Sequence, residues 1–484
     1  MSTFGGLSIA GSGLAAARAA LEVTGQNVAN ANTEGYTRQR VDLAPMTQTA
    51  LATFSKPTGY GDGVLIAGVS RMNDAVVDAR VNSTASGASY WSTSAAAVAT
   101  VETSLNEPST NGLASQLNAF WNDWQVVANN VGGTGASGAA NQLIQQGTLV
   151  ASTISAGYDA ASNAWTAART AADSTASTIN STAANIVDLN KTIRSLSAAG
   201  GNVNSLLDQR DAAVTTLAKL TGAAPRGNAD GTIDVVVGGN TLVSGVTSRS
   251  VQVGGAASFS DAVAGAGVSL VWTDSPTTPV ALDGGEMAAR IASLQPAATS
   301  GTGGVFAEAA KAYDDLATSI ATVVNDLHTT GVTPGGTPGG KFFDFKPSGP
   351  AATSLFVVPT SVDGIAAAGA SKGTRDNSIA DEIAQIGSSS TVTHPDGTTS
   401  PSPNSSWSMY VARIGTQSAT ASARASTSAI AANAATTAQN SVSGVDLDEE
   451  TSNLVLFQHA YQASARVIST INDVLDTLIT MGAR

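Results

Sequence analysis

The sequence predicts a mainly α-helical protein with an inserted β domain, and three observations support this fold class. Apolar residues recur every seven positions at both ends of the chain, which predicts that the N- and C-terminal helices pair as a coiled coil. Helical three-and-four spacing dominates the interior and predicts a long-helix bundle as the body. At Gly222 the composition changes to Val-, Thr- and Gly-rich strands. We therefore expect a terminal coiled-coil domain (1–40 plus 441–484), a helical body with short β segments (41–221 plus 286–440), and a small, outermost β domain (222–285).

Residues 7–30 form the first heptad element. Its apolar positions are Leu7, Leu14, Leu21 and Val28. Glycines beside this stripe would let another helix approach closely, but each interior glycine costs about 0.5–1 kcal/mol relative to alanine. The N-terminal helix is therefore marginal alone and needs a partner.

The last stretch of the chain supplies a matching helix. Its apolar seam consists of Leu447, Leu454, Phe457, Tyr461, Ile468, Ile471, Leu475 and Leu478. Asp446 is a natural N-cap with Glu449 three residues later, and Gly482 stands where a helix stop is expected. One thin seam does not offset an ordering cost of about 1–2 kcal/mol per residue. We therefore predict that residues 1–30 and 450–484 are mobile in the free monomer and become ordered only in an assembly.

Between the first helix and residue 221 the sequence predicts extended chain followed by helices. Residues 41–72 are expected to be extended and to lead into a short helix, Asn73–Val81. A helical pattern then runs from about Trp91 to Thr221, with breaks at Pro108 and in the glycine-rich turn 132–138, and its longest elements are expected at 139–196 and 204–220. Trp121 and Trp124 lie on a bulky stripe at helical spacing, which indicates core residues.

Beyond the β domain the pattern returns to helices, expected at 284–294, 306–328, 376–386 and 407–440. Residues 355–366 are expected to form a strand and a short Ala-rich turn. The tract 388–406 is rich in Ser, Thr and Pro, so we predict a mobile loop there.

Composition excludes several classes of function. The chain has no cysteine, which excludes disulfides, thiolate metal sites and cysteine nucleophiles. A formal net charge of −13 argues against binding to nucleic acid through its phosphates. His328, His394 and His459 are isolated in sequence and do not indicate a metal site. The first residues lack the basic and apolar regions of a signal peptide, and no apolar run approaches the ~20 residues of a membrane span. We therefore expect no catalytic residue, no metal and no cofactor.

Two motifs carry a resemblance to a known family. The first runs from Gln26 to Gln39 and includes Asn27, Asn30, Asn32, Thr33, Gly35, Tyr36, Arg38 and Gln39; the second is Asp208, Gln209, Arg210 and Asp211 after a Leu-Leu pair. The first motif resembles the N-terminal signature of the bacterial flagellar axial proteins, and both together most resemble the hook-associated protein 1 family. The runs 445–450 and 461–466 are similar to the same family, as is the segment from Asn325 to Phe343.

The resemblance implies a structural subunit of the bacterial flagellum that forms the ring joining hook to filament. It further implies export by the flagellar type III system without a cleaved signal peptide and an extracellular location at the hook–filament junction. The implied partners are further copies of the chain in a ring, hook protein below, hook-associated protein 3 above, and an export chaperone on the C-terminal helix. Neither nucleic acid nor membrane insertion is implied.

Three alternatives compete with this interpretation: another flagellar axial protein of the hook or rod type, a surface adhesin that uses the β domain, and a cell-wall hydrolase on an axial scaffold. A hydrolase requires positioned carboxylates. The acidic candidates are Asp208, Asp211, Asp446, Asp448, Glu449 and Glu450, and we interpret all of them as residues that favour the dipole at a helix start. The sequence therefore does not predict an enzyme.

Overall fold

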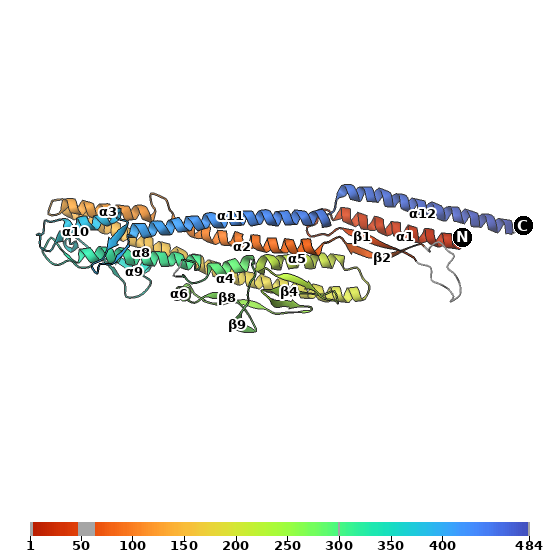
Figure 1. Ribbon diagram of the computed structural model, residues 1–484, viewed down its shortest axis with the longest axis horizontal. Helices are drawn as coiled ribbons and strands as arrows, with labels where there is room; N and C mark the ends of the chain where they lie inside the picture. Colours follow the sequence, from red (N-terminus) through yellow and green to blue (C-terminus); the bar gives the residue numbers. More distant parts are fainter. Residues whose placement is uncertain (1–2, 47–62, 299–300, 483–484) are drawn as a thin grey trace.

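A computed structural model describes residues 3–46, 63–298 and 301–482 of the chain. The molecule is elongated, and its long helices run side by side along the same axis (Figure 1). Both termini lie at one end, and the β strands of the insertion lie along one side of the helical body (Figure 1). The expected fold class, mainly α-helical with an inserted β domain, is confirmed.

The terminal unit contains two helices and one hairpin. Helix α1 (Thr3–Ala29) packs along α12 (Leu447–Gly482), which confirms the expected pairing of the terminal helices. An antiparallel hairpin of β1 (Gln39–Pro45) and β2 (Val64–Arg71) packs against α1, so that α1 lies between the hairpin and α12 (Figure 1). The remainder of the predicted extended segment, 47–62, lies outside the described residues.

Two long helices connect the terminal unit to the far end of the body. Helix α2 (Ala75–Leu105) packs along α11 (Pro403–Ser443). A helix is present at the expected Asn73–Val81, but its predicted end is wrong, because the helix continues unbroken to Leu105. Asp74 caps its start by accepting hydrogen bonds from the backbone of Val76 and Val77. Small Ala, Ser and Thr residues give this segment no bulky stripe, yet they allow close packing against α11.

The hydrophobic core lies in the body. Helices α3 (Leu113–Asn130), α4 (Ala136–Ala198), α5 (Asn204–Thr221) and α8 (Val305–His328) supply most of it. Trp124 is fully buried and packs against Phe120 and Phe342, in agreement with the interpretation of the tryptophan stripe as core. His328 is also buried, and its ring nitrogens bond backbone groups of Gly340 and Ala366. Burial lowers the pKa of His328, so the ring is held neutral as a structural residue.

Short elements close the far end of the body. They are α9 (Ala351–Ser354), α10 (Ser378–Gln385), the 3₁₀ turns Val362–Gly364 and Ile386–Ser388, and the strand pairs β10 (Gly331–Val332) with β13 (Ala368–Gly369) and β11 (Phe343–Phe345) with β12 (Leu355–Val357). Helix α7 (Gly285–Ser293) instead packs against α2, α4 and α5. The prediction of a loop at 388–406 is wrong, because β14 (Thr391–Thr393) and β15 (Thr399–Pro401) form a hairpin there. His394 fastens this hairpin, bonding Asp326 of α8 at 3.1 Å and Ser400 at 2.8 Å.

The inserted β region consists of two antiparallel sheets. One contains β3 (Ala224–Gly227), β4 (Ile233–Val237), β5 (Asn240–Ser244) and β6 (Thr247–Ser248); the other contains β7 (Val251–Gly255), β8 (Val268–Trp272) and β9 (Ser275–Pro279), with α6 (Phe259–Val263) between β7 and β8. The side chains of two asparagines on α4 bind the backbone of the two sheets. Asn180 exchanges two hydrogen bonds with Val251, and Asn190 exchanges two with Ile233.

Replacing Asn190 by alanine is expected to destabilise the protein by about 3 kcal/mol, because several buried backbone and side-chain groups would lose a partner. Asn190 is fully buried, and its amide also bonds Gly245 and Arg210. Urea unfolding measures the effect, with Asn163→Ala, an exposed position on the same helix, as the matched control. Equal unfolding free energies for the two variants would contradict the role of Asn190.

Candidate functional site at the junction of the terminal helices and the body

The two sequence motifs meet at one place in the structure, together with the start of α12. Residues 27–39 form the end of α1 and the turn into β1, and residues 208–211 lie on α5. Glu449 and Glu450 lie in the first turn of α12, and Arg71 ends β2. We call this set of residues the junction, because it connects the terminal unit to the body.

Arg38 connects the hairpin to α12. Its guanidinium Nε lies 2.6 Å from Glu450 Oε1, and its Nη1 lies 2.9 Å from Glu449 Oε2. Its backbone N–H donates to the carbonyl of Ser443, at the end of α11. The hydrogen bond from Arg38 lowers the pKa of Glu449, and hydrogen bonds to both carboxylates raise the pKa of Arg38. The Glu450 side chain is only 2% exposed, so the Arg38 cation offsets part of the cost of removing this carboxylate from water.

Asn27 uses its whole amide inside the junction. Its Nδ2 donates to the Gln39 carbonyl at 2.9 Å and to Glu450 Oε2 at 3.2 Å. Its Oδ1 accepts from the Gln39 backbone N–H at 3.0 Å and from the Tyr36 hydroxyl at 2.9 Å. Asn27 is 1% exposed. One buried side chain therefore orients the turn after α1 and the first turn of α12 at once.

Arg71 connects the hairpin to α5. Its Nε lies 2.9 Å from Asp208 Oδ1, and its Nη2 lies 2.6 Å from Asp211 Oδ2. The backbone N–H of Thr37 donates to the second oxygen of Asp208. Burial raises the pKa of Asp208, and the Thr37 bonds and the Arg71 charge act against that shift. Our interpretation of Asp208 and Asp211 as helix-start acids is wrong, because both lie beyond the first turn of α5 and pair with a cation from another element.

The interpretation of the acidic residues at the start of α12 is only partly right. Asp446 caps the helix as expected, because its Oδ1 accepts from the backbone N–H groups of Asp448 and Glu449. Glu449 and Glu450, however, are held by Arg38, so the helix dipole alone does not account for them.

The other motif residues have local or exposed positions. Arg210 points toward the β insertion, where it donates to Asn190 and to the carbonyl of Gly231, and burial lowers its pKa. Asn30 bonds the carbonyl of Gln26 and accepts from Thr33. Gly35 has φ +79°, which the turn requires and which favours glycine. Asn32 and Gln209 are exposed.

Sequence reasoning did not predict the contacts that three residues make at the junction. These are Arg71, Thr37 and Asn204, whose amide donates to Gln39 Oε1 at 3.1 Å and to the carbonyl of Val69 at 2.9 Å. Arg71 lies near the end of the predicted extended segment 41–72, so its place at the end of a β segment was visible. Its pairing with residues more than a hundred positions later has no local signal.

The predicted assembly seam is only partly covered within one chain. Phe457, Ile468, Ile471 and Leu475 are half-buried on the side of α12 toward α1, and so are Leu7, Leu14 and Leu21 of α1. Leu447, Leu454, Tyr461, Leu478 and Val28 are between 38% and 54% exposed. The fully buried apolar positions of α1 are instead small, namely Ala10, Ala16, Ala17, Ala20 and Val23. Close approach of the two helices therefore uses alanine, and much of the leucine surface stays free.

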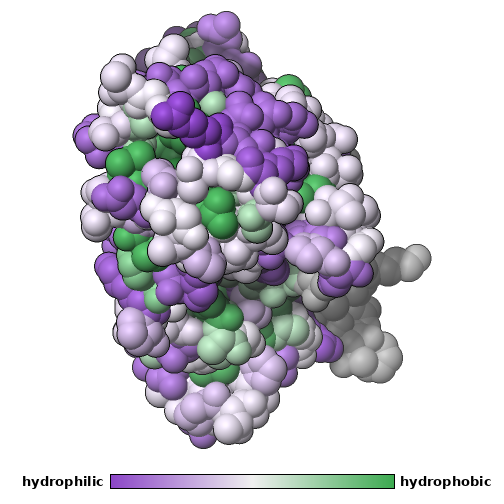
Figure 2. Space-filling model, turned by 90° about the vertical axis from the view of Figure 1, so that its left-hand side faces the viewer, coloured by the Kyte–Doolittle hydropathy of each residue, from purple (hydrophilic) through white to green (hydrophobic). Residues whose placement is uncertain are grey.

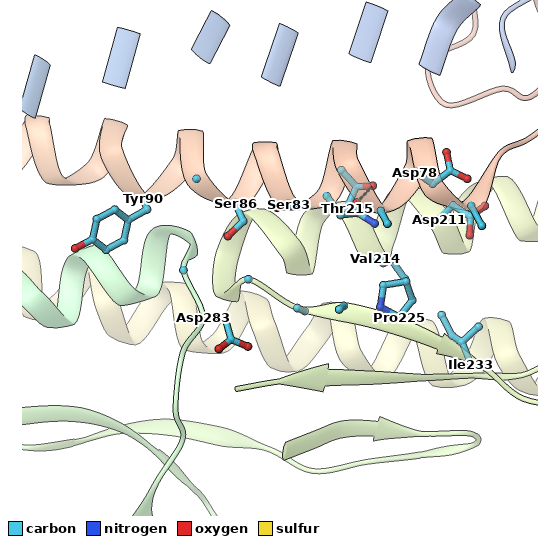
Figure 3. A pocket seen from close by; sticks show the side chains of 18 of the residues that line it. Asp78, Ser83, Ser86, Tyr90, Asp211, Val214, Thr215, Pro225, Ile233 and Asp283 are labelled. Carbon is cyan, nitrogen blue, oxygen red and sulfur yellow. Dashed lines mark hydrogen bonds between the residues drawn. The ribbon is translucent and has the colours of Figure 1, made fainter. Parts of the chain in front are cut away.

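A cleft of about 870 Å³ lies beside the junction, between α2, α5 and the linkers of the β insertion. Figure 3 shows Asp78 and Tyr90 on α2, Asp211 on α5 and Asp283 on the linker around it. Each carboxylate already has a partner: Asp78 accepts from Gln439, Asp211 pairs with Arg71, and Asp283 accepts from the backbone of Gly238. Across residues 3–46, 63–298 and 301–482, no group of three or more His, Asp and Glu side chains could hold a metal ion. In the same residues, no helix is both long and apolar enough to cross a membrane.

Raising the pH is expected to weaken the junction through Tyr36. Burial, with the nearby Asp208 and Glu450 charges, raises the pKa of Tyr36 to about 12, whereas an unfolded tyrosine ionises near 10. A raised pKa means that the contribution of Tyr36 is complete below about pH 10 and is lost as the pH rises toward 12. The difference in unfolding free energy between the wild type and Tyr36→Phe should therefore shrink over this range. Exposed Tyr461→Phe serves as the control, and a pH-independent difference for Tyr36→Phe would contradict the assignment.

Comparisons with known proteins agree with the fold and with the motifs. Residues 98–343 match the family model described as "Flagellar hook-associated protein FlgK helical domain". Residues 7–37 match "Flagella basal body rod protein", and residues 439–481 match "Flagellar basal body rod FlgEFG protein C-terminal". The two short matches thus cover α1 with the turn after it, and nearly all of α12.

Curated relatives and one solved structure extend this match over the whole chain. Flagellar hook-associated protein 1 of Bacillus subtilis is 30% identical, over 99% of this chain and 98% of the relative. Flagellar hook-associated protein 1 of Escherichia coli is 26% identical, over 97% and 98%. The flagellar hook junction protein FlgK of Burkholderia pseudomallei has the same fold, with a TM-score of 0.61 at 18% identity over 75% of this chain and all of that one. The chain therefore belongs to the flagellar hook-associated protein 1 family and is a structural component of the bacterial flagellum.

Proposed function

We propose that the chain is the subunit of a ring that joins the flagellar hook to the filament. It is exported by the flagellar type III system without a cleaved signal peptide and acts outside the cell. Further copies lie beside it in the ring, hook protein lies below, and hook-associated protein 3 lies above. Before export, a chaperone covers the C-terminal helix.

The observation that carries this proposal is the incomplete burial of the terminal unit. Among the residues whose burial the structure describes, the connected hydrophobic core runs from Val98 to Ile414 and includes none from α1, α12 or the β1–β2 hairpin. On α12, Leu456 is 60% exposed and Leu478 is 54% exposed. Exposed apolar surface on this scale indicates a protein–protein contact. The end of the molecule opposite the termini differs, because its hydrophobic residues form small patches among hydrophilic ones (Figure 2).

The exposed apolar surface of the terminal unit also suggests a different role for each part of the chain. We propose that residues 1–40 and 441–484 assemble, that 41–221 and 286–440 form the rigid body, and that 222–285 form an outer domain. The β1–β2 hairpin packs on α1, so it belongs with the terminal unit and not with the body. The junction transmits force between the terminal unit and the rigid body, because the ion pair of Arg38 holds α12 and the ion pair of Arg71 connects the hairpin to α5.

The alternatives have less support. The family match and the named relatives favour the hook–filament junction over a hook or rod protein. For a hydrolase, the carboxylates beside the cleft are already bound to partners of the same chain. An adhesin is supported only by the outer position of the β insertion.

Immunogold labelling of isolated hook–filament complexes tests the proposal. Gold is expected at the boundary between hook and filament only. Labelling along the hook, along the filament or in the rod would overturn the assignment to a ring between hook and filament.

Limited proteolysis tests the mobility of the terminal unit. In the free monomer, residues 1–30 and 450–484 should be cleaved well before the α3–α4 core, because few of their side chains are buried. The same sites should become resistant in hook–filament complexes. Termini as resistant as the core in the monomer would contradict the prediction.

A further inference from the structure

A serine, a histidine and an aspartate meet at the far end of the body, away from the junction. Ser400 lies on β15, His394 directly follows β14, and Asp326 lies near the end of α8. His394 Nε2 is 2.8 Å from Ser400 Oγ, and His394 Nδ1 is 3.1 Å from Asp326 Oδ2. A hydroxyl, an imidazole and a carboxylate joined in this order are the arrangement in which a histidine activates a nucleophilic serine. We call these three residues the triad.

The carboxylate of Asp326 determines which ring nitrogen of His394 carries the proton. An ionised carboxylate only accepts hydrogen bonds, so the imidazole donates to it from Nδ1. The lone pair of the neutral ring is then on Nε2, which faces the Ser400 hydroxyl. Ser400 therefore donates to Nε2, and the imidazole is oriented to take the serine proton.

The triad is held in place and can still be reached from solvent. The side chain of His394 is 18% exposed and that of Asp326 is 31% exposed, while Ser400 is half-buried. Backbone hydrogen bonds from His394 to Thr398 and from Ser402 to Ser390 fix the hairpin on both sides of Ser400. The contact between Asp326 and His394 is sufficient to fasten the hairpin to α8. The contact of Ser400 stays within the hairpin and adds nothing to that attachment.

We propose that Ser400 is a nucleophile that takes acyl groups from activated esters, with His394 as its general base and Asp326 as the residue that positions the imidazole. Ser400 Oγ attacks the carbonyl carbon of the ester, and its proton passes to His394 Nε2. The C–O bond to the leaving alcohol breaks, and Nε2 returns the proton to the departing oxygen. Water then splits the acyl-serine with the same base and regenerates Ser400. This activity goes beyond the proposed structural function and does not depend on the ring.

The residue after Ser400 limits the substrate to esters with a good leaving group. In many serine hydrolases the residue after the nucleophile supplies a backbone N–H to the oxyanion, but Pro401 has no N–H. Loss of one such donor costs about 10²–10³-fold in rate, whereas a general base contributes about 10²–10⁴-fold. An acceleration of that size suffices for aryl esters and excludes amides and peptides as substrates.

A fluorophosphonate probe tests the proposal, because it phosphonylates an activated serine with loss of fluoride and stays attached. The purified full-length chain is treated with the probe, and the labelled residues are located by peptide mass spectrometry. We expect one label per chain, on Ser400. Ser258 and Ser378 are internal controls that should stay unlabelled, because each donates directly to a carboxylate, of Asp261 and of Asp376 respectively.

Variants of the triad separate activation from folding. Ser400→Ala should lose the label. Asp326→Asn should slow the labelling of Ser400 by at least about a hundred-fold, because the tautomer of His394 is no longer fixed. Urea unfolding shows whether Asp326→Asn is folded, and His394→Gln, which removes the base, should abolish labelling as well.

Two results would overturn the proposal: wild-type Ser400 that stays unlabelled, or equal labelling rates in the wild type and in folded Asp326→Asn. Either result would leave the proposed structural function standing. Conversely, labelled Ser400 in a chain that is absent from the hook–filament boundary would support the nucleophile and refute the structural assignment.

Discussion

Replacing Arg38 by methionine is expected to lower the free energy that holds α12 on the junction by about 3–5 kcal/mol. The substitution keeps the apolar stem but leaves Glu450 as a buried carboxylate whose remaining junction bond comes from Asn27. A buried charge that loses its cation costs far more than an exposed pair, which contributes about 0–1 kcal/mol. Native-state hydrogen exchange of the first turns of α12 measures the loss as faster opening.

Two further variants make this result specific. Arg40→Met removes an arginine two positions away that is 67% exposed and pairs with Asp42 at 3.4 Å, so it should change the opening free energy by less than about 1 kcal/mol. Adding Glu450→Gln to Arg38→Met should restore much of the protection, since the buried charge is then gone. If Arg38→Met and Arg40→Met opened α12 equally, the junction would not depend on the Arg38–Glu450 pair.

Replacing Leu475 by aspartate is expected to block incorporation of the subunit while the body stays folded. Leu475 is half-buried on α12 toward α1, and a carboxylate there would be desolvated without a cation. Losing the burial of the Leu475 side chain costs about 1.5–3 kcal/mol, which corresponds to roughly ten- to hundred-fold weaker assembly. The body should keep its unfolding free energy within about 0.5 kcal/mol, since its core contains no residue of α12.

The measurement is the amount of the variant in isolated hook–filament complexes, together with urea unfolding of the purified monomer. Ser469→Asp adds the same charge on the exposed, opposite side of α12 and should be incorporated normally. Filaments of normal number built with Leu475→Asp would show that this side of α12 does not carry assembly.

Several parts of the fold could be predicted because local patterns report them. Heptad spacing marked both terminal helices, and the change of composition at Gly222 marked the strands that follow. The continuity of α2 was missed, because residues 82–90, between its two predicted helical stretches, carry no apolar stripe, although their small side chains suit close packing against α11. The β14–β15 hairpin was missed because its composition resembles that of a loop, and its fastening by His394 to Asp326 joins residues far apart in sequence.

The ion pairs of the candidate site were still harder to predict from local sequence. Asp208 and Asp211 were interpreted from their neighbours on the chain, whereas their partner, Arg71, comes from a different element. Arg38 and Glu450 are 412 positions apart, and nothing near either residue predicts the pair. Burial then decides their energetics, because the same two charges in water would attract only weakly.

The sequence by itself determined that both ends of this chain are amphipathic helices, that a β region is inserted in a helical body, and that the motifs belong to one flagellar family. These properties depend on periodicity and residue type, which are local. Only the tertiary structure decided which side of α12 lies toward α1 and which stays free, and that the two motifs meet in one buried junction. Periodicity fixes the residues that share a face of a helix, but the partner of that face, and the desolvation of each charge, depend on elements hundreds of residues away.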